Sequence, residues 1–408
     1  MNLYIFNESS RAAIYGVGTY IREITVSLKN SDISICVVNL ISDKTHIHTE
    51  EIDGISHWYF PAPIQEQRST DLQKQDELYY RNVVYLLQLH IKDRNNLIFH
   101  LNYYENGNLA KELKNAFDCR IVSVVHYSGW GLTVYDNLQR LRNILNEKHP
   151  DNFEKNLKKS FEEEKSFYSK VDHIICLSNY MQEILCRDYG LDATKISVIS
   201  NGLFDVANTI INRKFLRKKW NLGAGEKIIL FAGRMDEIKG LVFLIKAFHR
   251  VLFAYPQSRL VIAGDGDFRK FFKDAQDICT KVTYTGFLDK TQLYEWYSLA
   301  DIGVIPSLYE PFGYVAVEMM MHRLPVVATA TSGLNEVIDD GSGIKIPVME
   351  YPDRVEIDFN LLADKIIYLL EHPKEAKRLA QNARKRYEEL YSTDVFRRNM
   401  LKLYNTLL

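Results

Sequence analysis

The sequence has little net charge, few cysteines and no long apolar run. Its 408 residues carry 51 basic and 52 acidic side chains, with a formal net charge of -1 at pH 7, whereas nucleic-acid-binding proteins usually concentrate positive charge. The five cysteines are scattered and form no C-x-x-C pair, so neither a disulfide framework nor a zinc ribbon is predicted. No run approaches the roughly 18 apolar residues of a membrane span. We therefore expect a cytoplasmic protein with no nucleic acid as partner.

The chain is too long for one typical hydrophobic core, so two domains are expected. Short β-branched runs recur through its first half and are typical of buried strands. Apolar residues at helical spacing lie between several of these runs, for example Val17, Ile21, Ile24 and Leu28, which indicates strand-helix-strand units and a parallel sheet. The predicted strands are LYIF at 3–6, ISICVV at 33–38, LIFH at 97–100, IVSVVH at 121–126, HIICL at 173–177 and ISVI at 196–199.

The same pattern begins again after Asn201-Gly202. The second set of predicted strands is KIILFA at 227–232, RLVIA at 259–263, VTYT at 282–285, IGVI at 302–305, PVVAT at 325–329 and GIKI at 343–346. We therefore expect two doubly wound α/β domains with ligands bound in the cleft between them. The first domain is placed at 1–202 and the second at 203–392. A last helix at about 393–408 is expected to return to the first domain.

The stretch FAGRMDEIKG at 231–240 follows a predicted strand and begins a helix. Gly233 removes side-chain bulk at the strand end, Arg234 offers a fork of donors, and Lys239 brings a second positive charge. The free amides of a helix N-terminus also favour an anion. The stretch therefore predicts a phosphate-binding site, and the alternative is a solvated arginine and lysine in a loop.

The stretch SLYEPFGYVAVEMM at 307–320 also follows a predicted strand. Glu310 precedes the helix and Glu318 lies within it, so both carboxylates can face one cleft. Phe312 and Gly313 are expected to present backbone amides there. An acid before a helix can simply cap it, but Glu318 lies in the apolar run VAVEMMM, where an acid is seldom buried without a partner. Because carboxylates accept hydrogen bonds from hydroxyls, the stretch predicts contacts to a sugar.

Together these stretches closely resemble the donor-site signature of retaining glycosyltransferases of family 4, the glycogen-synthase-like members of the GT-B fold. GRMDEIKG and EPFGYVAVE carry the resemblance, and YGVGTY near the start, VISNG at the domain join, VIAGDGD at 261–267 and YTGFLD at 284–289 support it across nearly the whole chain. The resemblance implies a GT-B fold, in which two Rossmann-like doubly wound domains face a central cleft. It also implies that the N-terminal domain binds the acceptor and the C-terminal domain binds a nucleotide sugar.

The resemblance implies a role for each residue that matches a family motif. Arg234 and Lys239 match the basic pair that holds the donor diphosphate. Glu318 matches the acid that binds the ribose, and Glu310 matches the group that grips the hydroxyls of the donor sugar. His126 matches a histidine near the reacting face of the sugar. The predicted catalytic residues are His126, Arg234, Lys239 and Glu310, and the predicted donor-binding residues are Gly16, Gly18, Gly233, Arg234, Lys239, Gly264, Glu310, Phe312, Gly313 and Glu318.

Three features depart from the pattern of the family or need separate interpretation. The Gly16-Val17-Gly18 loop resembles the turn that closes over phosphate and acceptor, but Tyr15 stands where the family usually has a further glycine. The acid that usually follows the family histidine is replaced by Tyr127. Gly264 belongs to an incomplete glycine motif that does not match a dinucleotide fingerprint, and it is expected to give room in the cleft.

We therefore expect a glycosyltransferase that moves a sugar from a nucleoside diphosphate sugar, with a UDP-sugar favoured by the resemblance, to a glycan, peptide or lipid-linked acceptor with retention of configuration. Neither a cofactor nor a metal is expected, because no His and Cys cluster has the spacing of metal ligands. The expected location is the cytoplasm, including peripheral contact with the inner face of the membrane. Two alternatives stay open: a catalytically silent sugar-nucleotide-binding partner subunit, and a GT-B-fold epimerase that acts on the sugar nucleotide itself.

Overall fold

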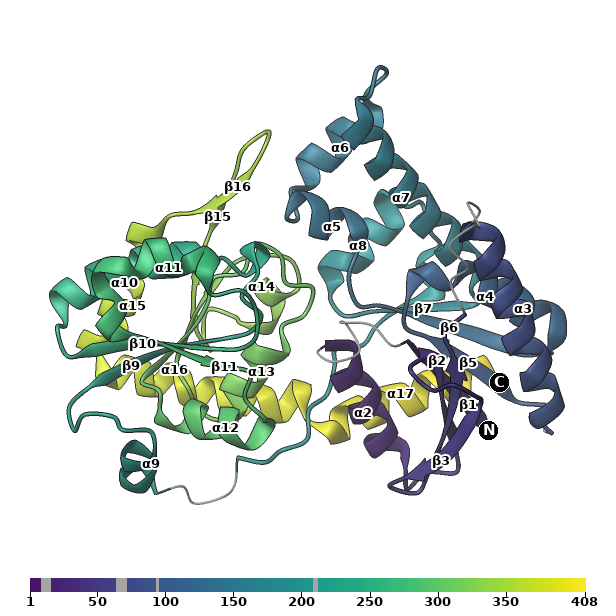
Figure 1. Cartoon of the computed structure of the whole chain (residues 1–408), viewed down its shortest axis with the longest axis horizontal. Coiled ribbons are helices and arrows are strands. Elements are labelled where there is room, and N and C mark those ends of the chain that lie inside the picture. The colour runs from purple at the N-terminus through teal and green to yellow at the C-terminus, as the bar shows by residue number, and fades with distance from the viewer. Residues whose placement is uncertain (9–15, 64–71, 93–94, 208–211) are drawn as a thin grey trace. The chain divides into compact units, whose positions relative to one another are not determined.

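The chain divides into two compact units, each built on a mostly parallel sheet with helices on both faces (Figure 1). The first unit consists of Met1–Ser128, Lys155–Gly202 and Thr393–Leu408, and the second of Gly129–Glu154 and Leu203–Ser392. The α/β class with two Rossmann-like sheets is therefore confirmed. The computed structural model describes residues 1–8, 16–63, 72–92, 95–207 and 212–408.

The first sheet has β1 and β5 at its centre and the strand order β3-β4-β2-β1-β5-β6-β7-β8. Strands β3 and β4 pair antiparallel, and the other described pairs are parallel. Leu3, Ile5 and Ile98 are 0% exposed, as expected for strands covered on both faces. The strands are β1 (Asn2–Glu8), β2 (Ser34–Ser42), β3 (His48–Ile52), β4 (Ile55–Pro61), β5 (Leu97–Leu101), β6 (Cys119–Val125), β7 (His173–Cys176) and β8 (Ile196–Val198).

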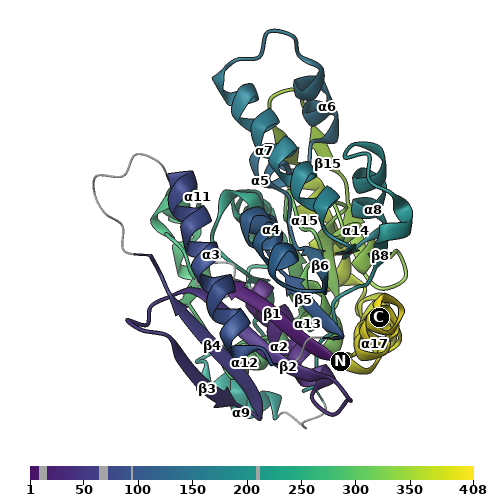
Figure 2. The same cartoon turned by 90° about the vertical axis from the view of Figure 1, so that its right-hand side faces the viewer.

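Helices cover both faces of the first sheet (Figure 2). Helices α2 and α17 lie side by side on one face, and α3 and α4 pack together on the other. The hydroxyl of Tyr404 on α17 lies 2.8 Å from Nδ1 of His100 on β5, so the last helix of the chain is fixed to the central part of this sheet. The helices are α2 (Gly16–Leu28), α3 (Leu72–His90), α4 (Gly107–Ala116), α7 (Asn152–Lys170, which begins in the second unit), α8 (Asn179–Arg187) and α17 (Thr393–Leu407).

The second sheet has β9 and β12 at its centre and the order β11-β10-β9-β12-β13-β14, with every described pair parallel. Counted from β9, this is the 3-2-1-4-5-6 order of the Rossmann fold. Ile229, Ile262 and Val304 are 0% exposed in its core. The strands are β9 (Lys227–Ala232), β10 (Ser258–Ala263), β11 (Val282–Gly286), β12 (Ile302–Ile305), β13 (Val326–Thr329) and β14 (Ile344–Ile346).

Helices α10, α11 and α15 cover one face of the second sheet, and α12, α13 and α16 cover the other (Figure 1). Phe248 of α10 is 0% exposed, and burying such a side chain fully contributes about 1.5 to 3 kcal/mol. None of the helices in the described ranges combines the length and apolar character that a membrane span needs. The helices are α9 (Arg213–Lys219), α10 (Leu241–Ala254), α11 (Arg269–Ala275), α12 (Lys290–Leu299), α13 (Tyr314–Met321), α14 (Leu334–Val337), α15 (Phe359–Glu371) and α16 (Pro373–Arg386).

Residues 129–154 group with the second unit, although the sequence analysis placed them in the first domain. Asn137 Nδ2 donates a hydrogen bond of 2.8 Å to the carbonyl of Tyr351, and the hydroxyl of Ser332 donates one of 2.6 Å to Asp136. These partners are about 200 positions away along the chain, so no local pattern indicates them. The remaining elements are α5 (Gly129–Val134), α6 (Leu138–Asn146), β15 (Val348–Glu350), β16 (Val355–Ile357) and the short turns η1 (Tyr104–Asn106), η2 (Ala193–Lys195), η3 (Glu237–Lys239), η4 (Gln276–Lys281) and η5 (Tyr387–Tyr391).

Candidate active site

The central strands of the second sheet end side by side where the strand order reverses. Strands β10 and β11 lie on one side of β9, and β13 and β14 lie on the far side of β12. In open α/β sheets, ligands bind outside the carboxyl ends of the strands at such a reversal. The loops after Ala232 and Ile305 meet here, because the amide of Leu308 donates a hydrogen bond of 2.8 Å to the carbonyl of Ile238. Both predicted motif stretches therefore lie at the one edge of the sheet where open α/β sheets bind ligands.

Lys239 and Glu310 form the central contact of this edge. Lys239 Nζ lies 2.6 Å from Glu310 Oε2, and the two side chains are 19% and 17% exposed. The hydroxyl of Ser307 donates to the same oxygen over 3.3 Å. Gly240, which follows η3, has a φ of 65°, and a Cβ atom there would collide with the carbonyl of Pro306. A glycine therefore permits the close approach of the two loops that brings the lysine and the carboxylate together.

Arg234 lies at the start of the loop that carries Lys239. Its Nε is 3.2 Å from Asp236 Oδ2, with side chains 29% and 30% exposed. An ion pair this close to solvent contributes about 0 to 1 kcal/mol to stability. A phosphate group, which offers more negative charge than one carboxylate, can therefore compete for the guanidinium of Arg234.

Glycines let the loops after β9 and β10 pack together. Gly233 and Gly264 have φ angles of 146° and 152°, and a Cβ atom on Gly264 would collide with the carbonyl of Gly233. The amide of Gly233 donates a hydrogen bond of 2.9 Å to the carbonyl of Ala263. From the sequence, Gly264 is expected to give room in a cleft. In the structure, its missing side chain lets its backbone approach the carbonyl of Gly233 closely.

Glu318 is buried on α13, with 1% of its surface exposed. Its Oε2 accepts a hydrogen bond of 2.8 Å from the hydroxyl of Tyr297, and its Oε1 pairs with Lys290 Nζ. Burial, with the nearby carboxylate, raises the pKa of Tyr297 well above its ordinary value. From the sequence, Glu310 and Glu318 are expected to face one cleft. The structure gives each carboxylate its own lysine, and the partners Lys290 and Tyr297 were not predicted.

The turn into α13 is built on Gly313, which precedes the helix with a φ of 94°. Phe312 is 3% exposed, and its ring lies 5.4 Å from that of Tyr314 between ring centroids. The amide of Leu334, after β13, donates a hydrogen bond of 3.1 Å to the carbonyl of Glu310. The ring of Phe312 therefore anchors this turn in the core, while the backbone around Glu310 is fixed by the neighbouring loop.

His126 follows β6 at the carboxyl edge of the first sheet. Its Nε2 lies 2.9 Å from Oδ1 of Asn102, which follows the neighbouring strand β5. Burial lowers the pKa of His126 to about 3. The ring is therefore neutral at ordinary pH, and Asn102 is a partner that the sequence analysis missed.

Gly16 and Gly18 lie in the first turn of α2 and not in a loop. The sequence analysis expected them to form a loop that closes over phosphate and acceptor, and Tyr15 of that stretch lies outside the described residues. Tyr20 and Ile24 are 0% exposed on the helix face that packs into the core. Burial of this apolar helix face stabilises the helix by more than the cost of about 1 kcal/mol for each glycine within it.

The described residues include no group of three or more His, Cys, Asp or Glu side chains that could hold a metal ion. The sequence does contain an Asp-x-Asp stretch at Asp265-Gly266-Asp267. Both carboxylate oxygens of Asp267 are bound by Arg269, at 2.7 and 2.9 Å. The carboxylate of Asp267 is therefore already paired with the guanidinium of Arg269.

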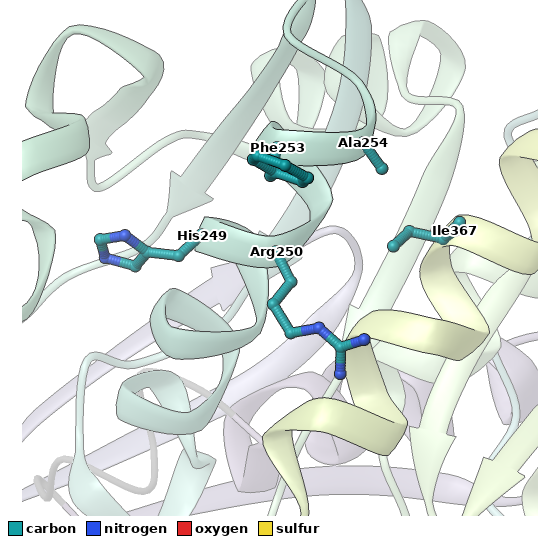
Figure 3. A pocket seen from close by; sticks show the side chains of 5 residues that line it. All are labelled: His249, Arg250, Phe253, Ala254 and Ile367. Atoms are coloured by element: carbon teal, nitrogen blue, oxygen red, sulfur yellow. The ribbon is translucent and has the colours of Figure 1, made fainter.

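A pocket of about 310 Å³ lies elsewhere on the second unit, between α10 and α15 (Figure 3). Phe253 is 92% exposed there, and Arg250 pairs with Asp364 over 2.9 Å. Helix α10 starts at the carboxyl edge of the sheet and runs to the opposite edge, so its last turns place this pocket away from Lys239. The pocket is lined by His249, Arg250, Phe253, Ala254 and Ile367, and it is not part of the candidate site.

Two family models match the chain. The model described as Glycosyl transferases group 1 matches residues 212–386, and the model described as Glycosyltransferase Family 4 matches residues 14–203. The first match contains all strands of the second sheet and both motif stretches. The second contains β2 to β8 of the first sheet.

Two curated relatives that are at least 30% identical match a little more than half of the chain. An uncharacterized glycosyltransferase of Methanocaldococcus jannaschii is 32% identical over 239 residues, which are 57% of this chain and 59% of that protein. The alpha-D-kanosaminyltransferase of Streptomyces kanamyceticus is 30% identical over 221 residues, which are 52% of this chain and 55% of that protein. The chain thus matches little more than half the length of these relatives.

Solved structures match the whole chain. The sucrose-phosphate synthase of Thermosynechococcus elongatus has a TM-score of 0.79 at 21% identity, covering 100% of this chain and 99% of that chain. HepE of Anabaena in complex with UDP-glucose has a TM-score of 0.73 at 16% identity and covers 100% of both chains. At these identities the likeness shows the fold, which is GT-B.

Proposed function

Because the chain belongs to the glycosyltransferases of the family 4 type with the GT-B fold, we propose that it transfers a sugar from a nucleoside diphosphate sugar to an acceptor. In this proposal the second unit binds the nucleotide sugar and the first unit binds the acceptor. The expected domain bounds at 1–202 and 203–392, with the last helix on the first domain, belong to the same proposal, except that residues 129–154 group with the second unit.

The observation that carries the proposal is the contact between Lys239 and Glu310 at the reversal of the second sheet. A partly buried cation and carboxylate stay paired because leaving either one without a partner is costly. A ligand that carries both a diphosphate and hydroxyls can separate them without that cost. The diphosphate accepts from Lys239, and Glu310 accepts from a sugar hydroxyl. A nucleoside diphosphate sugar has both groups on one molecule.

The other donor contacts follow from the same edge. Arg234 supplies a second cation for the diphosphate, and Glu318 accepts from the ribose, since a carboxylate oxygen that already has one donor can accept another. Lys290 and Tyr297 hold Glu318 in place for that contact. HepE has been solved with UDP and with UDP-glucose, which supports a UDP-sugar as the donor.

We further propose that the transfer retains configuration and requires no metal. Arg234 and Lys239 stabilise the charge that grows on the departing diphosphate, which is where such stabilisation has most effect. His126 is a poor base, because burial lowers its pKa to about 3. The leaving diphosphate is then the group that takes the proton of the attacking hydroxyl, on the face of the sugar from which it departs. Attack on that face gives retention.

The acceptor is proposed to be a glycan, a peptide or a lipid-linked sugar, bound at the carboxyl edge of the first sheet. Tyr127, next to His126, is partly exposed there, and its hydroxyl donates to Glu105 over 3.4 Å. Such aromatic and carboxylate groups suit hydroxyl-bearing ligands. We propose a cytoplasmic location, with peripheral contact at the inner face of the membrane for a lipid-linked acceptor.

The test is the release of free nucleoside diphosphate. Nucleotide sugars are first screened for a ligand-induced shift in melting temperature, and the binder is then incubated with candidate acceptors. Release that depends on both donor and acceptor supports the transferase. Conversion of the nucleotide sugar without acceptor would instead indicate the epimerase, and binding with no conversion under any acceptor would indicate the silent partner subunit.

The stereochemistry has its own readout. With an α-linked donor, the anomeric coupling constant in the proton NMR spectrum of the first product is expected to be that of an α linkage. A β-linked product would mean inversion and would require a base at the carboxyl edge of the first sheet.

A further inference from the structure

Asn102 makes two hydrogen bonds that together fix the orientation of its carboxamide. It is 1% exposed, its Nδ2 donates to the carbonyl of Phe6 over 2.8 Å, and its Oδ1 lies 2.9 Å from Nε2 of His126. A backbone carbonyl only accepts, so the atom that faces Phe6 must be the NH2 group. The atom that faces His126 is then the carbonyl oxygen, which also only accepts.

The proton position on His126 follows from this orientation. An oxygen that only accepts, at hydrogen-bond distance from Nε2, requires a proton on Nε2. Asn102 is neutral, so it does not stabilise a second proton on the ring as a carboxylate would. The Nδ1 atom therefore carries a lone pair, and it has no hydrogen-bond partner among the residues that the structure describes.

One further side chain packs against the ring of His126. The ring of Tyr20 on α2 lies 4.7 Å from it between centroids, in an edge-to-face arrangement. The hydroxyl of Tyr20 lies 3.1 Å from Nε2 of His100, and the hydroxyl of Tyr404 lies 2.8 Å from its Nδ1. The titratable groups against His126 are thus Tyr20 and His100, and burial keeps His100 neutral as well, with its pKa lowered to about 3.

We infer that Asn102 is a positioning residue, which holds His126 as the neutral Nε2–H tautomer so that Nδ1 accepts a hydrogen bond from a substrate hydroxyl. The role of Nδ1 toward a substrate rests on the proposed function, whereas the tautomer does not. The acid that usually follows the family histidine is Tyr127 in this chain. The neutral amide of Asn102, just after the neighbouring strand β5, orients the ring instead.

The kinetic test compares two substitutions of Asn102 that remove different bonds. Asn102→Ala removes both bonds and should lower kcat/KM roughly 3- to 10-fold at every pH. Asn102→Asp loses the donor to Phe6 but keeps an acceptor for Nε2, and its charge raises the pKa of His126. Its activity should be low near neutral pH and recover as pH rises and the ring loses the extra proton. If Asn102 only supported Phe6, both variants would be impaired equally at all pH values.

Two controls show whether the effect is specific to Asn102 and whether it acts through His126. Asn95→Asp makes the same change at an exposed position just before β5, and its pH profile should equal that of the wild type. In a His126→Ala background, Asn102→Ala should change kcat/KM less than about 2-fold, because the residue through which it acts is gone. An undiminished loss in that background would overturn the inference.

The tautomer of His126 can be measured without any substrate, so a negative result would overturn this inference and leave the proposed function untouched. In protein with 15N-labelled histidine, two-bond 1H–15N correlation spectra report which ring nitrogen carries the proton. The signal of His126 among the 11 histidines is assigned by its loss in His126→Ala. It should show a protonated Nε2 and an unprotonated Nδ1 from pH 5 to pH 8, and a mixture of tautomers in Asn102→Ala. A proton on Nδ1, or titration near pH 6.5, in the wild type would overturn the inference.

Discussion

The carboxyl edges of the two sheets follow the same strand logic but carry different chemistry. The strand order reverses at β1 and β5 in the first sheet and at β9 and β12 in the second. The second edge holds two pairs of a lysine and a carboxylate, Lys239 with Glu310 and Lys290 with Glu318. The first edge holds His126 joined to an uncharged amide. The contacts described at the reversal of the second sheet are thus between full charges, whereas the contact of His126 at the first edge is between uncharged groups.

This difference matches what each edge is proposed to bind. A diphosphate requires cations, and a charge-assisted hydrogen bond is about twice as strong as a neutral one. A hydroxyl requires only an oriented acceptor. At both edges the side chains named above contact one another, because an unpaired buried group is costly and an unpaired charge most of all.

Removing a cation from the charged edge should have the largest effect. Lys239→Ala and Arg234→Ala each remove a contact to the diphosphate worth about 1.5 to 3 kcal/mol, so kcat/KM for the nucleotide sugar should fall roughly 10- to 100-fold. Lys246→Ala, at an exposed lysine of α10, is the matched control and should keep the wild-type value. A folded Lys239→Ala protein with wild-type kinetics would mean that Lys239 does not bind the diphosphate.

Neutralising the carboxylate of the central pair should separate sugar recognition from diphosphate binding. Glu310→Gln weakens an acceptor for the sugar hydroxyls and should lower kcat/KM roughly 3- to 10-fold. The affinity for free UDP should not fall, because Lys239 no longer has a competing carboxylate. Steady-state kinetics and calorimetric titration of UDP measure the two quantities. Weaker UDP binding in this variant would show that Glu310 supports the lysine instead of competing for it.

The neutral edge should respond to acid through the buried His100, whose pKa burial lowers from 6.5 to about 3. Between these values the unfolded chain binds a proton that the folded chain does not, so the free energy of unfolding falls as pH falls, by at most about 1.4 kcal/mol per pH unit. Glu8 acts in the opposite direction, because burial raises its pKa to about 7 and the folded chain then binds the extra proton. The slope of the free energy of unfolding against pH must therefore be compared between variants.

Urea unfolding at pH 7, 6 and 5 gives these slopes. His100→Gln should show a smaller loss of stability toward acid than the wild type, and His46→Gln, at an exposed position, should show the same loss. Equal slopes for His100→Gln and the wild type would mean that His100 is protonated in the folded chain near its ordinary pKa.

Removal of divalent metal ions with EDTA should not change the rate of the reaction. If Arg234 and Lys239 neutralise the diphosphate, release of nucleoside diphosphate should proceed at the same rate in excess EDTA. Abolition by EDTA with rescue by Mg²⁺ or Mn²⁺ would contradict this charge arrangement, and the Asp-x-Asp stretch at 265–267 would then be the first place to examine.

The central strands could be predicted because buried parallel strands are apolar on both faces. Each predicted run, such as KIILFA at 227–232, forms a strand. The hairpin of β3 and β4 was missed. Residues 49–52 of β3 are all exposed, and three of them are polar. This is typical of an edge strand, and it leaves no apolar run from which the strand could be predicted.

Motif residues of the candidate site could be predicted, but their partners could not. Gly233, Lys239 and Glu310 lie in short stretches whose spacing is visible locally. Lys290 binds Glu318 from 28 positions away, and Asn102 binds His126 from 24 positions away. Contacts of this kind come from the order of strands in the sheet, which one sequence does not display.

The most direct test of the account is the affinity of the second unit's carboxyl edge for UDP. Isothermal titration of UDP should be performed on the full chain, on Lys239→Ala and on the control Lys246→Ala. We predict that UDP binds the wild type and the control equally and binds Lys239→Ala at least about 10-fold more weakly. Equal affinity of all three proteins for UDP would contradict the claim that Lys239, at the reversal between β9 and β12, holds the diphosphate.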